Sequence, residues 1–341
     1  MSNVNSSPKE KKIAIAGASG AVGVEFIQVL EALDFPVSEL KLLASERSAG
    51  KEMTFKGETL VVEKMTPESF KNVDIALFSA GSSISREYEK HLVNAGCIMI
   101  DNSSAFRMRD DVPLIIPEIN PEDAKKHHGV IANPNCSTII MLMAMFPIHK
   151  EFPVERVVVS TYQAASGAGW AAMEELRIAT EHHLRGESFT PKIIPHPYAF
   201  NTFSHNSEVD ESGYNEEERK MVRETHKILH DESIGIAPTC VRVPVFRAHS
   251  ESINLQFRNA APSVEKCREL LSAFPGLELV DDPANNRFPM PIDASGAYDC
   301  LVGRVRKDIS RPENGIELFI SGDQLLKGAA LNAVQIAQLF V

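Results

Sequence analysis

The feature that most constrains the fold of this chain is a glycine-rich turn close to its N-terminus. Apolar residues 11–16 predict a strand, which runs into Gly17-Ala-Ser-Gly-Ala-Val-Gly23 before a helical pattern over residues 24–33. Glycines at this spacing let the backbone approach a pyrophosphate, which lies at the helix N-terminus. An ordinary strand–helix turn is the alternative. The placement predicts a dinucleotide-binding turn, with contacts from Gly17, Ser19, Gly20, Ala21, Val22 and Gly23.

The turn after the second predicted strand bears on the choice of cofactor. Residues 40–44 form that strand, and Ser45-Glu-Arg-Ser-Ala-Gly-Lys51 follows it. An NAD-binding unit usually places an acidic side chain here, on the ribose 2′-hydroxyl. Ser45, Arg47 and Ser48 instead offer hydroxyls and a cation, and Glu46 is expected to point away. This pattern predicts NADP, with a solvated polar loop as the alternative.

Strands and helices alternate through residue 132, which predicts a doubly wound parallel sheet. Strands are expected over residues 74–81, 97–100 and 129–132, with a helix over 82–95. Ligands of such sheets bind beyond the carboxyl ends of the strands. The residues expected to line one crevice there are Ser79, Ala80, Gly81, Asn102, Ser103, Arg107 and Cys136.

Cys136 is predicted to lie between a strand and a long apolar helix. The strand ends at Asn133-Pro-Asn135, where Pro134 blocks its continuation, and residues 139–148 are apolar enough for a buried helix. The N–H groups and the dipole at a helix N-terminus favour an anion, which lowers the pKa of a thiol there. A buried structural cysteine is the alternative. Cys136 is therefore a candidate nucleophile.

The pattern changes after residue 150. A strand over residues 154–161 and a helix over 171–184 are followed by an irregular excursion, residues 186–212, and by a helix with Asn215 as its N-cap. Four strand-like runs, residues 236–243, 249–258, 299–305 and 316–320, have few helices between them. This order predicts an α+β domain with a mostly antiparallel sheet, and a last amphipathic helix runs towards Phe340.

Composition excludes several classes of function. The chain has 341 residues, enough for two domains, and a formal net charge of −11 that argues against nucleic acid as a partner. Its five cysteines are scattered, which suits a reducing compartment, and no metal site is expected. Residues 1–10 lack a signal-peptide core, and no apolar run could span a membrane. We expect a cytoplasmic protein, with an organelle form that has lost its transit peptide as the alternative.

Taken in order, segments along nearly the whole chain resemble the aspartate-β-semialdehyde dehydrogenase family. They are the glycine turn 17–23, Ala44-Ser-Glu-Arg-Ser-Ala-Gly50, Asn102-Ser-Ser-Ala-Phe-Arg107, Asn133-Pro-Asn-Cys-Ser-Thr138, Tyr162-Gln-Ala-Ala-Ser-Gly167, Glu217-Glu-Arg-Lys220, Arg242-Val-Pro-Val with Ala248-His249, and Lys327-Gly-Ala-Ala330. The resemblance implies a Rossmann-like NADP-binding domain, residues 1–133 with 323–341, and a catalytic and dimerisation domain, residues 134–322. It also implies a homodimer or homotetramer that makes aspartate semialdehyde for lysine, methionine and threonine synthesis.

Carried over motif by motif, the resemblance assigns roles to individual residues. Cys136 becomes the nucleophile and His249 the general acid/base, while Gln163 orients the substrate. The substrate-binding residues are Arg242 for the α-carboxylate, Glu217 for the α-ammonium, Arg107 and Lys220 for the phosphate, and Asn102. A one-residue slip to Glu216 or Glu218 remains open. The cofactor set extends to Ser79, Ala80, Gly81, Ser166, Gly167 and Gln324, the last at a position where many family members have Asn.

These residue types also suit the chemistry on independent grounds. A thiolate attacks an acyl phosphate to give a thioester, and the oxyanion needs donors, for which the Cys136 amide and the Asn135 side chain are candidates. Hydride transfer from NADPH then gives a thiohemiacetal, whose proton a histidine with a pKa near neutrality can manage. A hydrogen-bonded strand histidine and an edge arginine are the alternatives for His249 and Arg242.

Two rival functions remain. Another acyl-phosphate reductase, acting on N-acetylglutamyl phosphate or glyceraldehyde 3-phosphate, would share the thiolate chemistry. An acetylated amine is uncharged, however, and does not need Glu217 opposite Arg242. A non-catalytic NADP-binding regulator would not require Cys136, Gln163 and His249 together.

Overall fold

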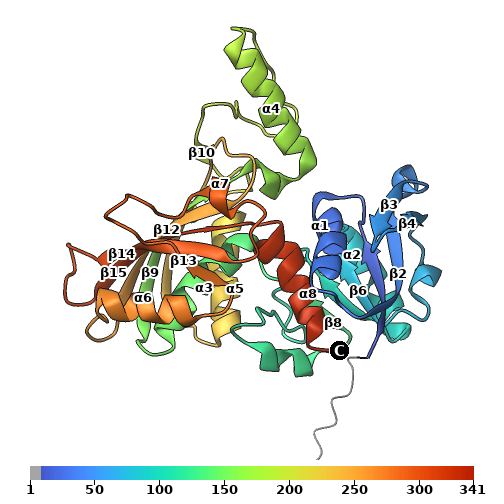
Figure 1. The fold of residues 1–341 in the computed structure, drawn as a ribbon, viewed down its shortest axis with the longest axis horizontal. Coiled ribbons are helices and arrows are strands. Elements are labelled where there is room, and N and C mark those ends of the chain that lie inside the picture. The colour runs from blue at the N-terminus through green and yellow to red at the C-terminus, as the bar shows by residue number, and fades with distance from the viewer. Residues whose placement is uncertain (1–8) are drawn as a thin grey trace, which may run out of the picture. The chain divides into compact units, whose positions relative to one another are not determined.

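The structure is a computed structural model that describes residues 9–341, so most of the polar N-terminal stretch lies outside the described residues. The chain divides into two compact units (Figure 1). The first runs to Pro134 and includes Ala329–Val341, and the second is Asn135–Gly328. The last helix therefore belongs to the same unit as the glycine turn.

The first unit is built on a six-stranded parallel sheet with the order β5-β2-β1-β6-β7-β8. Its strands are β1 (Lys11–Ala16), β2 (Val37–Ala44), β5 (Glu63–Lys64), β6 (Ile75–Phe78), β7 (Ile98–Asp101) and β8 (Val130–Ala132). Its helices are α1 (Ala21–Ala32), α2 (Ser82–Asn94) and α8 (Leu331–Gln338), and α8 packs beside α1 and against β6 and β7. Every residue of β6 is buried, as expected for a strand covered on both faces. The predicted doubly wound sheet is confirmed.

The second unit contains a seven-stranded sheet with the order β10-β11-β9-β12-β15-β14-β13. Its strands are β9 (Val154–Gln163), β10 (Phe203–Ser204), β11 (Gly235–Arg242), β12 (His249–Phe257), β13 (Leu277–Leu279), β14 (Cys300–Lys307) and β15 (Gly315–Gly322). Only the β11–β9 and β13–β14 pairs are parallel, so the mostly antiparallel prediction is confirmed. Its helices are α3 (Cys136–His149), α4 (Trp170–Leu184), α5 (Glu216–Leu229), α6 (Val264–Ala273) and α7 (Pro291–Ala294).

Several elements were not predicted. They are the hairpin β3 (Glu52–Phe55) and β4 (Glu58–Val61), the edge strands β5, β10 and β13, helices α6 and α7, the 3-10 helices η1 (Glu46–Ser48), η2 (Pro67–Phe70), η3 (Pro121–Lys126) and η4 (Ala165–Ala168), and the π-helix η5 (Leu326–Ala330). These elements are short, and the hairpin and β5 expose most of their side chains. Their hydrophobic periodicity is therefore weak. Helix α6 had a usable signal, because Ser263 caps it and Cys267 and Leu271 form its buried side.

The excursion after α4 is irregular in secondary structure but well packed. Helix α4 stands away from the sheet of the second unit (Figure 1). A core cluster formed by Ala165, Ala172, Leu176, Ile194 and Tyr198 joins the helix to the excursion. The buried Glu175 carboxylate accepts backbone N–H bonds from Lys192, Ile193 and Ile194 at 2.6–2.8 Å. These contacts hold the excursion in a defined place within its unit.

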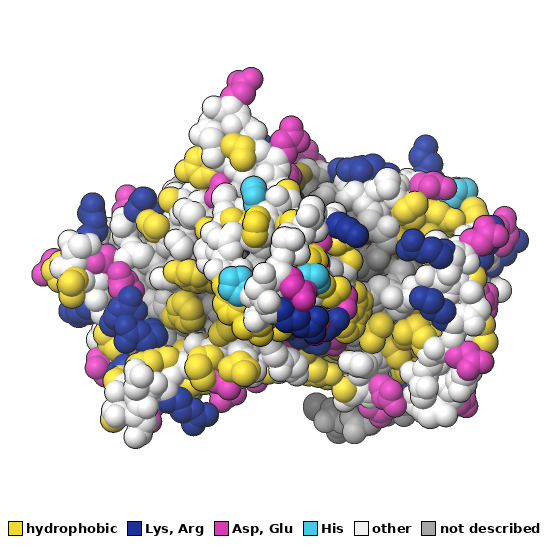
Figure 2. All heavy atoms as spheres, turned by 90° about the horizontal axis from the view of Figure 1, so that it is seen from above, with side chains coloured by type: hydrophobic (Ala, Val, Ile, Leu, Met, Phe, Trp, Pro, Cys, Tyr) yellow, Lys and Arg dark blue, Asp and Glu magenta, His cyan; other side chains and the backbone are white. Residues whose placement is uncertain are grey.

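The surface carries charges of both signs. Figure 2 shows lysine and arginine side chains interspersed with acidic ones on the face drawn there. Within residues 9–341, no helix is both long and apolar enough to cross a bilayer.

Candidate active site

The glycine turn of the first unit follows β1 at the centre of the parallel sheet. Gly17 has a φ of +86°, and a Cβ on it would lie 2.3 Å from the Ser79 carbonyl oxygen. Glycine is therefore required both for the backbone conformation and for the approach of the turn to Ser79. Helix α1 follows the N-cap Gly20, and no side chain within the described residues caps it. Its first N–H groups therefore lack a side-chain acceptor, an arrangement that fits a pyrophosphate.

The predicted 2′-phosphate residues follow β2, the neighbour of β1. Ser45 and Arg47 are exposed, whereas Ser48 is buried. Glu46 forms an ion pair with Lys64 of β5 at 2.9 Å. The structure therefore places Ser45–Ser48 and Ser79–Gly81 on either side of the glycine turn, at the carboxyl ends of adjacent strands.

Arg107 forms hydrogen bonds to the residues that directly follow β7 and β8 in the first unit. It is buried, and it donates from Nε to the Asn133 carbonyl at 2.9 Å and from Nη2 to the Asn102 carbonyl at 3.0 Å. The Asn133 side chain in turn donates to Asn102 Oδ1 at 2.6 Å. The structure therefore brings together Asn102 and Arg107, two of the residues predicted to bind substrate.

Cys136 is the first residue of α3, as predicted. The N-cap is Asn135, whose side-chain oxygen accepts hydrogen bonds from the backbone N–H groups of Ser137 and Thr138. All five cysteines lie within the described residues as thiols, and Cys136 is half-buried while the other four are buried. Burial raises the pKa values of Cys97 and Cys267 to about 12 and also raises that of Cys240. Among the five thiols, Cys136 is therefore the one accessible to a substrate.

Two buried carboxylates of α5 hold the turn that carries Cys136. Glu217 accepts a hydrogen bond from the Asn135 side chain at 2.9 Å, and Glu224 accepts one from the Asn135 backbone N–H at 2.6 Å. Gln163, at the end of β9, donates to Glu217 and to Ser137 Oγ, both at 3.1 Å. Glu224 was missed in the sequence, although its spacing from Glu217 places both on one face of the helix.

The structure distinguishes the three consecutive acids of α5. Glu216 is exposed, and Glu218 closes a capping box with Asn215 and accepts the backbone N–H of Cys240. Glu217 is the one that reaches Asn135 and Gln163, and Lys220 Nζ lies 3.3 Å from it. Burial opposes its ionisation, but attraction to His205 when that ring is protonated, attraction to Lys220 and the two hydrogen bonds hold the pKa of Glu217 below its usual value. Glu217 is therefore anionic at neutral pH.

Arg242 ends β11 and is buried rather than lying at an exposed edge. Its guanidinium donates to the Ala164 carbonyl at 3.1 Å, to His205 Nε2 at 2.9 Å and to Asn206 Oδ1 at 3.3 Å. Sequence reasoning missed His205 because it falls in the excursion, away from any motif. The contacts of Arg242 show that the excursion takes part in this centre.

His249 opens β12 and is fully buried. Its Nδ1 accepts the Ala164 backbone N–H at 3.0 Å, so in the neutral ring Nε2 carries the proton. Burial, together with the charge of Arg242, lowers the pKa of His249 to about 3. The expectation of a pKa near neutrality is therefore wrong for this conformation, because the sequence does not reveal complete burial beside an arginine.

The remaining predicted cofactor residues lie around His249. A Cβ on Gly167 would come within 3.0 Å of His249 Nε2, so this backbone lies directly against the imidazole. Gln324 donates to Ser166 Oγ and accepts the backbone N–H of Ala248 at 3.0 Å. Ala248 itself has a φ of +72°, an uncommon conformation for a residue with a Cβ. The Gln324 amide thus ties the Ser166 turn to the start of β12.

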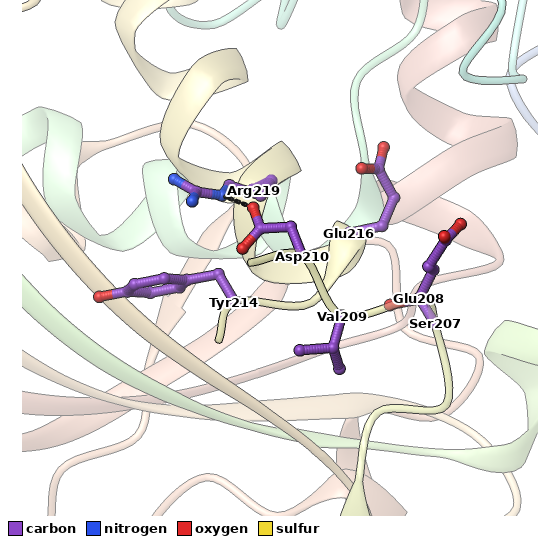
Figure 3. Close-up of a pocket in the computed structure, with 7 residues that line it drawn as sticks. All are labelled: Ser207, Glu208, Val209, Asp210, Tyr214, Glu216 and Arg219. Atoms are coloured by element: carbon purple, nitrogen blue, oxygen red, sulfur yellow. Dashed lines mark hydrogen bonds and ion pairs between the residues drawn. The ribbon is translucent and has the colours of Figure 1, made fainter. Parts of the chain in front are cut away.

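A pocket of about 270 Å³ lies in the second unit, against the first turns of α5. It is lined by Ser207, Glu208, Val209, Asp210, Tyr214, Glu216 and Arg219. Figure 3 shows Asp210 turned towards Arg219, with which it forms an ion pair at 2.7 Å, and Glu208 and Glu216 extending away from them. The only cation of this lining, Arg219, is already paired with Asp210, and none of the lining residues is a thiol, so the candidate centre is the one around Cys136.

Together these features define a nicotinamide-dependent dehydrogenase with a cysteine centre. Two family models match the chain: the semialdehyde dehydrogenase NAD-binding domain over residues 12–127, and the semialdehyde dehydrogenase dimerisation domain over residues 145–327. The chain belongs to the aspartate-semialdehyde dehydrogenase family, and the predicted resemblance is confirmed.

Relatives and solved structures match over nearly full length. The chain is 52% identical to an aspartate-semialdehyde dehydrogenase of Synechocystis sp., with 98% of each chain covered. It is 46% identical to that of Bacillus subtilis, with 96% of each covered. The crystal structure of aspartate-semialdehyde dehydrogenase II from Vibrio cholerae, complexed with ASA, has a TM-score of 0.94 at 43% identity, covering 97% of this chain and 98% of that one. The Candida albicans enzyme with NADP has a TM-score of 0.73 at 25% identity, covering 97% and 98%.

Proposed function

We propose that this protein reduces L-aspartyl-4-phosphate with NADPH to L-aspartate-4-semialdehyde and phosphate, reversibly, in amino-acid biosynthesis. The observation that carries the proposal is the buried, anionic Glu217 hydrogen-bonded to Asn135, the residue directly before Cys136. An anionic side chain next to a nucleophile suits a substrate that carries an ammonium group. The identities of the relatives support the same reaction.

The chemistry of the chain's own residues follows from their placement. The Cys136 thiolate attacks the acyl carbon, the bond from that carbon to the phosphate oxygen breaks, and a thioester forms. The N–H groups at the start of α3, including that of Cys136, are candidate donors to the oxyanion. The Asn135 side chain, the other predicted donor, is already engaged by Glu217 and by the helix cap. The nicotinamide cofactor, when bound, supplies the hydride.

His249 remains our proposal for the acid/base residue. In the tautomer selected by the Ala164 N–H, Nε2 holds the proton and meets a developing oxyanion as a neutral donor. Protonation of His249 on Nδ1 would point that new N–H at the Ala164 backbone N–H, so the present hydrogen bond would be lost. We therefore propose that His249 first acts as a hydrogen-bond donor and that proton transfer follows a shift of this contact.

Substrate recognition is divided among charged residues. We assign the α-ammonium to Glu217, the α-carboxylate to Arg242, and the phosphate to Lys220 and Arg107, with Asn102 beside Arg107. A guanidinium binds a carboxylate in a two-point geometry that lysine cannot reproduce. An N-acetylated substrate would leave the Glu217 charge buried without a cationic partner from the substrate, which disfavours the rival reductase.

We further propose NADP as the cofactor and a homodimer as the smallest assembly, with a homotetramer as the other possible form. Ser45, Arg47 and Ser48 supply the 2′-phosphate contacts, since the nearest acid, Glu46, is paired with Lys64. For the dimer, α3, α5 and α6 pack on the second-unit sheet, and β9 residues that point the opposite way, Ser160 and Tyr162, stay partly exposed. The match to a dimerisation domain supports a second copy as the partner of that face.

A steady-state assay tests the function. Purified protein in phosphate buffer is offered NADP with aspartate semialdehyde, N-acetylglutamate semialdehyde or glyceraldehyde 3-phosphate, and NADPH formation is followed. We expect turnover with aspartate semialdehyde and much less with the other two. Preference for either rival aldehyde, or no turnover with any, would overturn the assignment.

A further inference from the structure

The end of the excursion lies directly against the two residues assigned to the charged groups of the substrate. Strand β10 pairs antiparallel with the end of β11, with Phe203 opposite Arg242, and the His205 N–H donates to the Cys240 carbonyl at 2.8 Å. The Phe203 ring packs edge-on against Tyr198, with centroids 5.3 Å apart, and Tyr198 belongs to the excursion's core cluster. The position of His205 is thus determined by both backbone pairing and side-chain packing.

The contact between His205 and Arg242 determines the tautomer of the imidazole. The guanidinium can only donate, so His205 Nε2, 2.9 Å from Arg242 Nη2, must be the acceptor. The ring proton then lies on Nδ1 and is donated to Ser207 Oγ at 3.0 Å. The Ser207 backbone N–H, 3.2 Å from the same nitrogen, cannot donate to it in this tautomer, because a neutral imidazole accepts at one nitrogen only. Burial lowers the pKa of His205 to about 4, which is consistent with a neutral ring that accepts from a cation.

The same segment also reaches Glu217. Its backbone N–H donates to Ser207 Oγ at 3.2 Å, so this hydroxyl accepts from both His205 and the first turn of α5. Asn206 Oδ1 accepts from Arg242 Nε at 3.3 Å. Three consecutive residues of the excursion therefore connect the predicted carboxylate-binding and ammonium-binding residues through hydrogen bonds.

We propose that His205 is a positioning residue that sets the orientation of the Arg242 guanidinium towards the α-carboxylate of the substrate. Arginine has a long side chain with many rotamers, and an acceptor at one terminal nitrogen restricts the plane of its fork. With Nη2 held by His205 and Nη1 by the Ala164 carbonyl, the guanidinium is oriented before the substrate arrives. This inference rests on the proposed function, because it takes the ligand of Arg242 to be a substrate carboxylate.

Two substitutions of similar size distinguish the loss of the hydrogen-bond acceptor at His205 from the loss of the volume of its ring. His205→Gln can place an amide oxygen near the position of Nε2, whereas His205→Leu fills comparable space without an acceptor. Loss of a hydrogen bond to a charged group should raise the KM for aspartate semialdehyde by about tenfold in the Leu variant. We expect kcat to change by less than about threefold, since His205 does not touch the reacting atoms. The Gln variant should recover most of the wild-type KM.

Two further measurements distinguish positioning from a general loss of structure. The KM for NADP, the melting temperature and the rate of Cys136 alkylation by iodoacetamide should stay near their wild-type values in both variants. His183→Gln, at an exposed histidine of α4, is the matched control and should leave all parameters unchanged. If the Leu variant melts early, the Gln variant alone decides, because a disturbed KM in a stable Gln variant contradicts the proposal.

The outcomes separate this inference from the proposed function. Absence of aspartate semialdehyde turnover in the wild-type protein would overturn the function itself. Normal wild-type turnover with the same KM in the wild-type and Leu proteins would overturn the role of His205 alone. A fall in kcat with an unchanged KM would also overturn it, because positioning of a substrate-binding arginine acts on binding.

Discussion

The Asn135 side chain donates a hydrogen bond to the Glu217 carboxylate at 2.9 Å, and its oxygen caps the helix that begins with Cys136. The residue proposed to bind the substrate ammonium therefore also holds the turn that presents the nucleophile. Gln163 reaches the same carboxylate oxygen at 3.1 Å. A ligand that pairs with the Glu217 carboxylate would therefore affect the same hydrogen bonds that hold the turn carrying Cys136.

Glu217→Gln tests the charge of this residue while keeping its shape. Glutamine can still accept from Asn135, so α3 should keep its cap, but the attraction for an ammonium group is lost. We expect the KM for aspartate semialdehyde to rise about tenfold or more. Glu216→Gln, at the exposed neighbouring position, is the control and should behave as wild type. Equal effects of the two substitutions would indicate a general charge effect, and an effect of Glu216→Gln alone would indicate a one-residue slip.

Cys136→Ala should abolish turnover while NADP still binds, because the glycine turn is built from other residues. In the wild-type protein, iodoacetamide near neutral pH should label Cys136 ahead of the four buried cysteines. Peptide mapping by mass spectrometry identifies the labelled thiol. An active Cys136→Ala protein, or faster labelling of another cysteine, contradicts the role of Cys136.

Arg47→Ala tests the choice of cofactor. The wild-type protein should prefer NADP over NAD by at least about tenfold in kcat/KM, since one charge-assisted bond to the 2′-phosphate is worth about 1.5–3 kcal/mol. The substitution should remove most of this preference by weakening NADP binding while leaving NAD nearly unchanged. Glu46→Ala should have little effect because its carboxylate is paired with Lys64. If NAD and NADP weaken equally, Arg47 serves the shared pyrophosphate or the fold.

Gly17→Ala and Gly57→Ala separate backbone conformation from close contact. Both glycines have positive φ, +86° and +81°. A Cβ on Gly57 meets nothing within 4 Å, whereas a Cβ on Gly17 would lie 2.3 Å from the Ser79 carbonyl oxygen. The backbone conformation alone should lower the free energy of unfolding by about 1–2 kcal/mol in each variant. Overpacking against Ser79 should lower it by about 1–3 kcal/mol more in Gly17→Ala. Thermal unfolding measures both losses, and equal melting temperatures would contradict the close contact.

The burial of Glu251 leads to a prediction about how the stability of the folded protein depends on pH. It is fully buried on β12, neither carboxylate oxygen has a hydrogen-bond partner within residues 9–341, and burial raises its pKa well above the usual value. The folded state therefore keeps a proton that the unfolded chain loses above about pH 4.3. This group's contribution to stability consequently falls as the pH rises from there towards the folded-state pKa.

Glu251→Gln should remove this penalty. The variant should be more stable than wild type at about pH 8 and differ little at about pH 4, where both states of the wild-type side chain are largely protonated. Chemical denaturation at the two pH values measures the difference. A variant that loses stability equally at both would show that Glu251 has a packing role that its charge state does not explain.

Local sequence patterns were sufficient to predict the parts of the protein whose structure depends on residues that are neighbours in the chain. The glycine turn between β1 and α1, the helix start at Cys136 and the Asn215 cap of α5 are all formed by residues close together in the chain. Their geometry follows from steric limits and unsatisfied backbone N–H groups, which act over one turn of helix. The parallel sheet could also be predicted, because a chain in which buried strands alternate with helices has few other ways to cover both faces of its strands.

The contacts that complete the centre depend on residues far apart in the chain. Asn135 and Glu224 are 89 positions apart, and His205 and Arg242 are 37 apart, yet each pair shares a hydrogen bond. No periodic pattern encodes such pairs, because they arise when α5 packs on α3 and when β10 adds to the edge of β11. The same packing buries His249 beside Arg242 and lowers its pKa. Burial and long-range hydrogen bonding are properties of the assembled core, so the charge state and tautomer of these side chains are determined by the tertiary structure.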